Sequence, residues 1–280
     1  MRAPWQSMVV AGVAIAAMVG SAPVGSSATT RPASAHKVRL PPANGRFDYQ
    51  LGGSYKPLPS VRIVDRDRTS RPAPGVYNIC YINAFQTQPE NDGWWKRHHP
   101  KLLLRNAKGA LIEDPGWPGE IILKTSTSAD RRALLKIEAA WLHGCQAKGF
   151  DAVESDNLDS NTRSHGLLTQ ADDFAFAKLL VAQGHADGLA MAQKNDAEQS
   201  SHLRRTVHFD FAIAEECQVY DECSFYLKTY GDEVYEIEYT DNGRAAYQTA
   251  CAKRGSQISV ILRDRDVVPR GAKGYVYEAC

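Results

Sequence analysis

The chain has 280 residues, with 33 Lys and Arg against 32 Asp and Glu and a hydrophobic fraction of 43%. This composition is typical of one large or two small globular domains and excludes an intrinsically disordered chain. The formal net charge of +1, without any basic run, gives no electrostatic case for a nucleic-acid partner.

The N-terminal segment has the pattern of a secretory signal peptide. Arg2 supplies a positive charge, residues 8–19 form an apolar run too short to span a bilayer, and small residues follow. We expect a signal peptide at residues 1–28, a flexible tether rich in Ser, Thr, Pro and Ala at 29–43, and a folded domain at 44–280. The protein is therefore predicted to be secreted and free of the membrane after cleavage. A membrane anchor retained in the mature protein is the alternative.

Strand and helix patterns alternate along the folded segment. Strands are expected as a short lead-in at residues 47–51 and then at 61–65, 76–83, 120–124, 149–154, 188–193, 207–214, 234–239 and 258–262. Helices are expected at 128–148, 169–183, 197–205, 222–230 and 243–253, and residues 86–118 are rich in loop signals. Repeated strand-helix units of this number predict an α/β fold, a single-domain (β/α)8 TIM barrel. A doubly wound open sheet is the alternative, but no Gly-x-Gly-x-x-Gly follows a strand.

The six cysteines are an even number behind a predicted signal peptide, which indicates a fold stapled by disulfides. One pair is only six residues apart and can close a small loop, while the other four cysteines can pair in three ways. A zinc site is the alternative, but the chain has no Cys-x-x-Cys spacing and secretion disfavours it. The pairing that we favour is Cys217–Cys223, Cys80–Cys145 and Cys251–Cys280.

The segment at residues 149–159, GFDAVESDNLD, begins as a buried strand and ends in a polar cluster. The cluster contains Glu154, Asp156, Asn157 and Asp159. Three carboxylates and an amide are costly to desolvate without a function. In α/β barrels the active site lies at the C-terminal ends of the strands. We interpret the cluster as part of an active site, and a polar turn with a helix N-cap is the alternative.

Other predicted strands also end in polar side chains. These are Tyr81 and Asn83, Lys194 and Asn195, Glu215 and Glu216, and Glu238 and Tyr239. Two carboxylates from different strands that face one another are what glycoside hydrolysis needs. One protonates the departing oxygen and the other supports the positive centre, and neighbouring acids can separate their pKa values.

Several of these residues also have a purely structural interpretation. Glu216 can belong to a solvated loop, and Lys194 can be a surface charge or a partner that keeps Asp156 ionised. Tyr81, Tyr239 and the Trp pair at residues 94–95 can pack in the core or stack on sugar rings. We expect no metal and no cofactor, with a metal at His98–His99 or calcium near Asp156 as the alternatives.

Four stretches together resemble a known family. They are residues 149–159, residues 188–196 (GLAMAQKND), residues 210–217 (DFAIAEEC) followed by 220–223 (YDEC), and residues 237–239 (IEY). They are similar to the endo-α-1,4-polygalactosaminidases of glycoside hydrolase family 114, over about residues 46–280. The resemblance implies a secreted (β/α)8 hydrolase that cleaves α-1,4-linked galactosamine polymers internally.

The resemblance also implies roles for individual residues. Asp156 would be the nucleophile or stabiliser and Glu215 the general acid/base. Glu216 stands where the family often has Gln, so the choice between Glu215 and Glu216 stays open. Phe47 and Tyr49 stand where the family often has Trp. The expected substrate-binding set is Tyr81, Glu154, Asn157, Asp159, Lys194, Asn195, Glu216, Glu238 and Tyr239.

The expected partner is a cationic or partly N-acetylated galactosamine polysaccharide, which an acidic cleft would concentrate by opposite charge. We expect a monomer. The alternatives are a secreted carbohydrate-binding barrel with little or no turnover, a hydrolase of another amino-sugar polymer, and a metal-dependent deacetylase.

Overall fold

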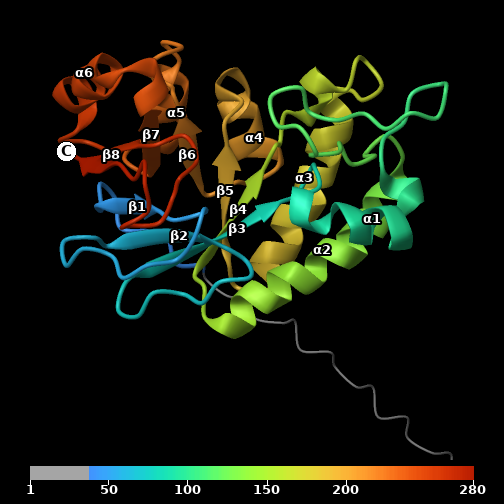
Figure 1. Ribbon diagram of the computed structural model, residues 1–280, viewed down its shortest axis with the longest axis horizontal. Helices are drawn as coiled ribbons and strands as arrows, with labels where there is room; N and C mark the ends of the chain where they lie inside the picture. The colour runs from blue at the N-terminus through green and yellow to red at the C-terminus, as the bar shows by residue number, and fades with distance from the viewer. Residues whose placement is uncertain (1–37) are drawn as a thin grey trace, which may run out of the picture. The chain divides into compact units, whose positions relative to one another are not determined.

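Nine strands form one sheet in chain order in the computed structural model, which describes residues 38–280 (Figure 1). Strands β1 to β8 run parallel, and β9 runs antiparallel beside β8. The Tyr277 hydroxyl in β9 donates to the backbone oxygen of Phe47 in β1 at 2.8 Å, so the last strand is tied to the first. The strands are β1 (Phe47–Tyr49), β2 (Ile63–Asp67), β3 (Tyr77–Asn83), β4 (Ala152–Asp156), β5 (Ala190–Lys194), β6 (Phe211–Glu215), β7 (Val234–Tyr239), β8 (Ser259–Arg263) and β9 (Tyr277–Ala279).

Helices cover the outside of the strands (Figure 1). They are α1 (Asp92–His98), α2 (Ser128–Lys148), α3 (Gln170–Ala186), α4 (Ser200–Thr206), α5 (Cys223–Tyr230) and α6 (Arg244–Arg254). The predicted TIM barrel is confirmed, and the doubly wound alternative is wrong. The alternation is incomplete, however, because the connections at residues 50–62 and 68–76 contain no helix.

Side-chain caps and a glycine set the boundaries of α2 and α3. The Thr127 side chain accepts the backbone N–H of Asp130 at the start of α2, and Gly149 ends that helix with φ 92°. Thr169 and Asp172 form a complete capping box at the start of α3. The sharp left-handed end at Gly149 returns the chain directly into β4, the strand that carries the polar cluster.

The strands bury two apolar clusters because successive side chains alternate between the two faces of a strand. Inside the barrel lie residues such as Ile63, Ile79, Phe211 and Ile237. Between the barrel and its helices lies a second cluster, which contains Ile82, Val153, Met191, Leu134 and Leu142. At the C-terminal ends of the strands the inward positions are polar instead, so the barrel has an apolar floor and a polar mouth.

Two predicted strands occupy a different place in the structure from the one expected. The segment at 47–51 was expected only as a lead-in, but its first residues form β1, the first barrel strand. The segment at 120–124 is not a barrel strand, because it makes isolated antiparallel bridges to Gln86, Leu103 and Glu113. Ile121, Ile122 and Leu123 are fully buried there. The apolar pattern of residues 121–123 therefore predicted their burial correctly. It did not indicate which segments they would pair with.

All three favoured disulfides are present: Cys80–Cys145, Cys217–Cys223 and Cys251–Cys280. The first joins β3 to α2 across a separation of 65 residues, and the third joins α6 to the end of the chain. Closing long loops reduces the conformational entropy of the unfolded chain. The short second loop has a different effect, since it constrains the segment that directly follows β6.

The described residues include the end of the segment predicted as a tether. The Tyr77 hydroxyl donates to the backbone oxygen of Arg39 at 2.6 Å, and the Tyr235 hydroxyl donates to that of Pro42 at 3.1 Å. These residues are therefore attached to the barrel. The predicted signal peptide and the rest of the tether lie outside the described residues. Among residues 38–280, no helix is long and apolar enough to cross a membrane.

Candidate active site

A cavity of about 540 Å³ opens among the C-terminal ends of the strands. Its walls come from β1, β3, β4, β5, β6 and β7, from the loop between β3 and α2 and from the segment that follows β8. Because parallel strands end at the same edge, residues far apart in sequence meet here. The predicted site residues that line it are Asp156, Glu215, Tyr81, Asn157, Asp159, Lys194, Asn195, Glu216 and Tyr239.

Two predicted substrate-binding residues do not line this cavity. Glu154 is fully buried one layer deeper in the barrel, below Lys194. Glu238 is also buried and accepts the backbone N–H of Gln218 at 3.0 Å. Burial and neighbouring Glu236 raise the pKa of Glu238 to about 8. Strand alternation explains both placements, because Glu154 lies two residues before Asp156 and Glu238 points to the opposite face from Tyr239.

Lys194 is the centre of the site. Its Nζ lies 2.6 Å from Glu154 Oε1, 3.2 Å from Asp156 Oδ1 and 3.3 Å from Glu215 Oε2. The Tyr49 hydroxyl lies 3.2 Å from the same nitrogen. The Lys194 side chain is only 2% exposed. One buried ammonium of β5 therefore bridges two carboxylates of β4 and one of β6, and the surface-charge interpretation of Lys194 is wrong.

The ion cluster favours the charged forms of Lys194 and Asp156. Burial alone would lower the pKa of Lys194, but Asp156, Glu154 and Glu215 together raise it well above its ordinary value. Burial would likewise raise the pKa of Asp156, but the Lys194 ammonium and the Tyr81 hydroxyl outweigh it and lower this pKa. Asp156 is therefore an ionised carboxylate at neutral pH, as a nucleophile requires.

Hydrogen bonds fix the orientation of both candidate catalytic carboxyl groups. The Tyr81 hydroxyl donates to Asp156 Oδ2 at 2.8 Å. The Tyr239 hydroxyl donates to Glu215 Oε1 at 2.5 Å, and Asn195 Nδ2 donates to Glu215 Oε2 at 3.0 Å. Such contacts lock the rotamers of functional side chains.

The chain leaves three of these strands through left-handed backbone. Asn157, Asn195 and Glu216 directly follow Asp156, Lys194 and Glu215, and their φ angles are 66°, 52° and 59°. Asn tolerates this region, whereas Glu adopts it rarely. Strained residues of this kind cluster at active sites. This left-handed turn bends the backbone directly after β4, β5 and β6. The side chain of the last residue in each of these strands therefore faces the cavity.

Asp156 and Glu215 lie close together. Since each has an oxygen within 3.3 Å of the same Lys194 nitrogen, those two oxygens are at most about 6.5 Å apart. Retaining glycosidases separate their carboxyl groups by about 5 to 5.5 Å, and inverting ones by about 6.5 to 9.5 Å. The upper bound between the two nearest oxygens therefore includes the retaining separation.

Ion pairs neutralise several acids on the rim of the cavity. Arg163 lies 2.6 Å from Asp114 and 2.9 Å from Asp159. Arg265 lies 2.5 Å from Glu216, and its guanidinium stands 4.0 Å above the Tyr239 ring. Glu216 therefore has a fixed cationic partner, unlike the solvated loop residue considered above.

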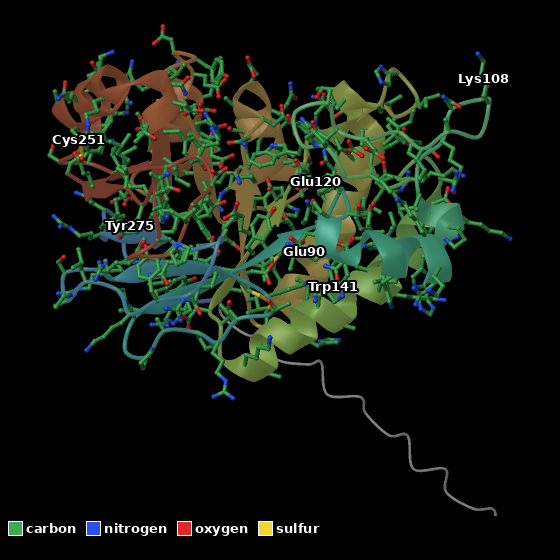
Figure 2. All side chains as sticks on the ribbon, in the orientation of Figure 1. Glu90, Lys108, Glu120, Trp141, Cys251 and Tyr275 are labelled. Atoms are coloured by element: carbon green, nitrogen blue, oxygen red, sulfur yellow. A yellow bond between two sulfur atoms is a disulfide. The ribbon has the colours of Figure 1, made fainter. Side chains whose placement is uncertain are left out.

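Glu120 is one of the cavity-lining acids that lie outside the predicted set. It lines the cavity together with Glu90, and both are labelled in Figure 2. Asn83 Nδ2 donates to Glu120 Oε2 at 2.9 Å, and Asn157 Nδ2 donates to Asn83 Oδ1 at 2.9 Å. Burial, aided by the charge of Asp156, raises the pKa of Glu120 to about 7. Tyr49, Asn83, Arg163 and Arg265 were likewise absent from the predicted set.

Aromatic residues have separate roles here. Trp117 is half-exposed and lines the cavity. Trp95 is buried and Trp94 packs against it at 5.2 Å between ring centroids, both in α1 and outside the cavity lining. The sugar-stacking surface at this cavity is thus offered by Trp117 rather than by the predicted pair.

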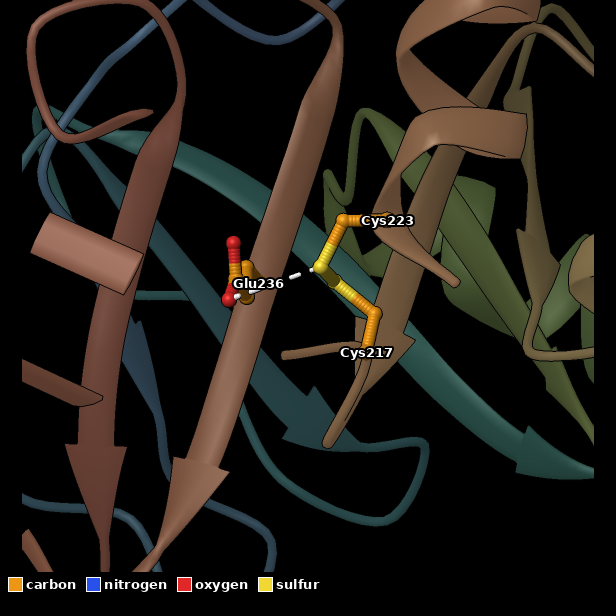
Figure 3. A group of neighbouring side chains, drawn as sticks. All are labelled: Cys217, Cys223 and Glu236. Atoms are coloured by element: carbon orange, nitrogen blue, oxygen red, sulfur yellow. Dashed lines mark hydrogen bonds between the residues drawn. A yellow bond between two sulfur atoms is a disulfide. The ribbon is translucent and has the colours of Figure 1, made fainter. Parts of the chain in front are cut away.

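One group of potential metal-ligating side chains occurs among residues 38–280: Cys217, Cys223 and Glu236 (Figure 3). Its two sulfur atoms are joined in a disulfide, so they offer no thiolate. Glu236 is paired with Arg254, whose Nη2 lies 2.7 Å from Oε1. At the acid cluster, the Lys194 ammonium already pairs with the carboxylates that calcium would need.

We expect Lys194→Met to lower the free energy of unfolding at pH 7 by about 3–5 kcal/mol, because it leaves buried carboxylates unpaired. Without the ammonium, burial raises the pKa of Asp156, so the loss shrinks as the pH falls and Asp156 takes up a proton. Urea unfolding at pH 7 and pH 5 measures both effects.

The matched control is Lys124→Met, which removes a partly exposed lysine 3.3 Å from Asp130. Its cost should stay below about 1 kcal/mol because solvent screens the pair. Equal losses in the two variants at pH 7 would contradict the central role of Lys194.

Comparisons with known proteins agree with the barrel fold. The structure of Aspergillus fumigatus Ega3 in complex with galactosamine superposes with a TM-score of 0.67 at 22% identity, covering 89% of this chain and 100% of that one. The glycoside hydrolase domain of PelA from Pseudomonas aeruginosa gives a TM-score of 0.56 at 14% identity, covering 81% and 97%. No curated protein matches the chain in sequence. The model of glycoside hydrolase family GH114 matches residues 27–280, so the chain belongs to this family and is a glycoside hydrolase.

Proposed function

We propose that this protein is a secreted, endo-acting hydrolase of α-1,4-linked galactosamine-containing polysaccharide. In this proposal Asp156 is the nucleophile and Glu215 the general acid/base. The observation that supports it most directly is the pair of cavity-lining carboxylates bridged by the buried Lys194 ammonium. The choice of Glu215 over Glu216 rests on their contacts, because Glu216 is neutralised by Arg265 whereas Glu215 faces Asp156 across Lys194.

The proposed reaction has two steps. In the first, the Asp156 carboxylate attacks the anomeric carbon while Glu215 donates its proton to the departing glycosidic oxygen, which breaks the bond and forms a glycosyl ester. In the second, the Glu215 carboxylate takes a proton from water, the water oxygen attacks the anomeric carbon, and Asp156 is released. Lys194 stabilises each carboxylate as its negative charge returns.

An amino sugar fits the charges of the cavity. Glu120 and Glu90 line the wall without an ion-pair partner among the described residues, so they attract a cationic chain. Glu120 is part-buried and fixed by Asn83, which suits it to accept hydrogen bonds from an ammonium group. Trp117 at the rim offers a face for a neighbouring sugar ring. The galactosamine bound in the Ega3 structure supports the same substrate class.

The proposed location is extracellular. Three disulfides in one chain indicate an oxidising compartment, which agrees with a signal peptide at residues 1–28. We propose that residues 44–280 act as a monomeric catalytic domain, preceded by a tether at residues 29–43 whose end is attached to the barrel.

Asp156→Asn and Glu215→Gln should each lower cleavage of partially deacetylated α-1,4-galactosaminan by about 100-fold or more, because each removes a group that acts in bond breaking. Glu216→Gln is the matched control, with the same substitution one residue further along, and should keep most of the activity. The measurement is the release of short oligosaccharides. Full loss in Glu216→Gln together with an active Glu215→Gln would reverse the assignment.

Glu120→Gln should lower kcat/KM on a deacetylated polymer by about tenfold, because it removes the charged acceptor for the ammonium group. Activity on a highly N-acetylated polymer should change little. Since the pKa of Glu120 is about 7, the preference of the unchanged enzyme for the deacetylated polymer should also fall below that pH.

The control is Glu113→Gln, which alters an exposed acid of the same loop outside the cavity lining. Paired kinetics on the two polymers measure the effect. A drop of the same size on both polymers in Glu120→Gln would argue against recognition of the amine.

A further inference from the structure

A second buried carboxyl group lies below the ion cluster. Asp65 in β2 is fully buried. Within residues 38–280 neither of its carboxyl oxygens has a hydrogen-bond donor, and Glu154 Oε2 also has none. The other Glu154 oxygen accepts hydrogen bonds from Tyr49 at 2.8 Å and from Lys194 at 2.6 Å. Leaving three carboxylate oxygens unpaired in a barrel interior is costly.

A shared proton removes most of this cost. The Asp65 and Glu154 carboxyl groups lie within hydrogen-bond reach of each other. Two ionised carboxylates cannot hydrogen-bond, whereas a protonated one donates to the other. Burial first, and then the charge of Glu154, raises the pKa of Asp65 well above its ordinary value, although Lys194 opposes this. Burial also raises the pKa of Glu154, but there Lys194 and the hydrogen bond from Asp65 act against it. Because Tyr49 and Lys194 both donate to Glu154 and no described residue donates to Asp65, the proton belongs on Asp65.

The protonation state of Asp65 affects the cavity because it influences the position of Lys194. The titratable groups that face Asp65 are Glu154, Asp156 and Lys194. A neutral Asp65 donates to Glu154 Oε2 and leaves Oε1 for Tyr49 and Lys194. An ionised Asp65 would add a negative charge below the ammonium and draw it away from Asp156 and Glu215.

We propose that Asp65 is a positioning residue that, as a neutral acid, donates its proton to Glu154 and so holds Lys194 between Asp156 and Glu215. Nothing in its sequence context suggested this role, because Asp65 ends an ordinary alternating strand pattern. The kinetic consequence rests on the proposed function, whereas the protonation state of Asp65 does not.

The protonation state is tested by infrared spectroscopy of the complete folded domain. A protonated carboxyl group gives a carbonyl-stretch band that a carboxylate lacks, and labelling with ¹³C-aspartate separates Asp from Glu. At pH 9 the buried acids Asp173 and Asp196 are ionised, since their pKa values are about 6 and 7. We expect one label-sensitive band in the unchanged protein that is absent from Asp65→Asn. No such band, or a band that persists in Asp65→Asn, would overturn the proposal whatever the enzyme cleaves.

The positioning role is tested by two substitutions of similar shape. Asp65→Asn keeps an N–H donor for Glu154 and should retain most of kcat. Asp65→Leu has no donor, so Lys194 should shift and kcat should fall by up to about 100-fold with little change in KM. The acid limb of the pH profile should move to higher pH in Asp65→Leu only, because a displaced Lys194 no longer lowers the pKa of Asp156.

Equal kcat values or identical pH profiles in Asp65→Asn and Asp65→Leu would overturn the positioning role. If no polymer is cleaved by the unchanged enzyme, the proposed function fails. The pKa of Asp156, followed by NMR, then reports on the position of Lys194 in the same two variants.

Discussion

The site depends on one buried ammonium. Lys194 lies almost without solvent between three carboxylates from β4 and β6, and its charge allows acids to stand this close together. Breaking such a buried cluster by removing one partner is far more costly than losing a surface pair. The same ammonium lowers the pKa of Asp156 and lies 3.3 Å from Glu215. Stability and proposed catalysis thus rest on the same atoms.

The barrel supplies this cluster through strand alternation. Inward side chains lie in layers, with apolar residues below and Asp65, Glu154 and Tyr49 at an intermediate depth. Asp156, Lys194 and Glu215 form the layer that meets the cavity. Two residues of β4 therefore have different surroundings, since Glu154 contacts Lys194 from below while Asp156 lines the cavity. The left-handed residues that follow β4, β5 and β6 end each strand at this level.

Sequence patterns predicted the parts of the site that strands carry. Asp156, Lys194, Glu215 and Tyr239 each follow an apolar strand pattern, and their side chains meet because parallel strands share one end. Glu120 could not be found this way, because its segment looked like a barrel strand but lies in the long loop between β3 and α2. Tyr49 was missed because β1 has only three residues and looked like a lead-in. The sequence also did not indicate how deep each side chain lies in the barrel. Glu154 and Asp156 both point inward from β4, and only the structure shows that Glu154 is buried while Asp156 lines the cavity.

The central claim is that Lys194 holds Asp156 and Glu215 close enough for double displacement through a glycosyl ester. ¹H NMR of the first product formed from a fully deacetylated α-1,4-oligogalactosamine tests this directly, because that substrate has no acetamide to assist the reaction. The account predicts that the new reducing end appears first as the α anomer and only then mutarotates. Initial release of the β anomer would contradict it, since inversion requires room for a water molecule between the sugar and its carboxylate base.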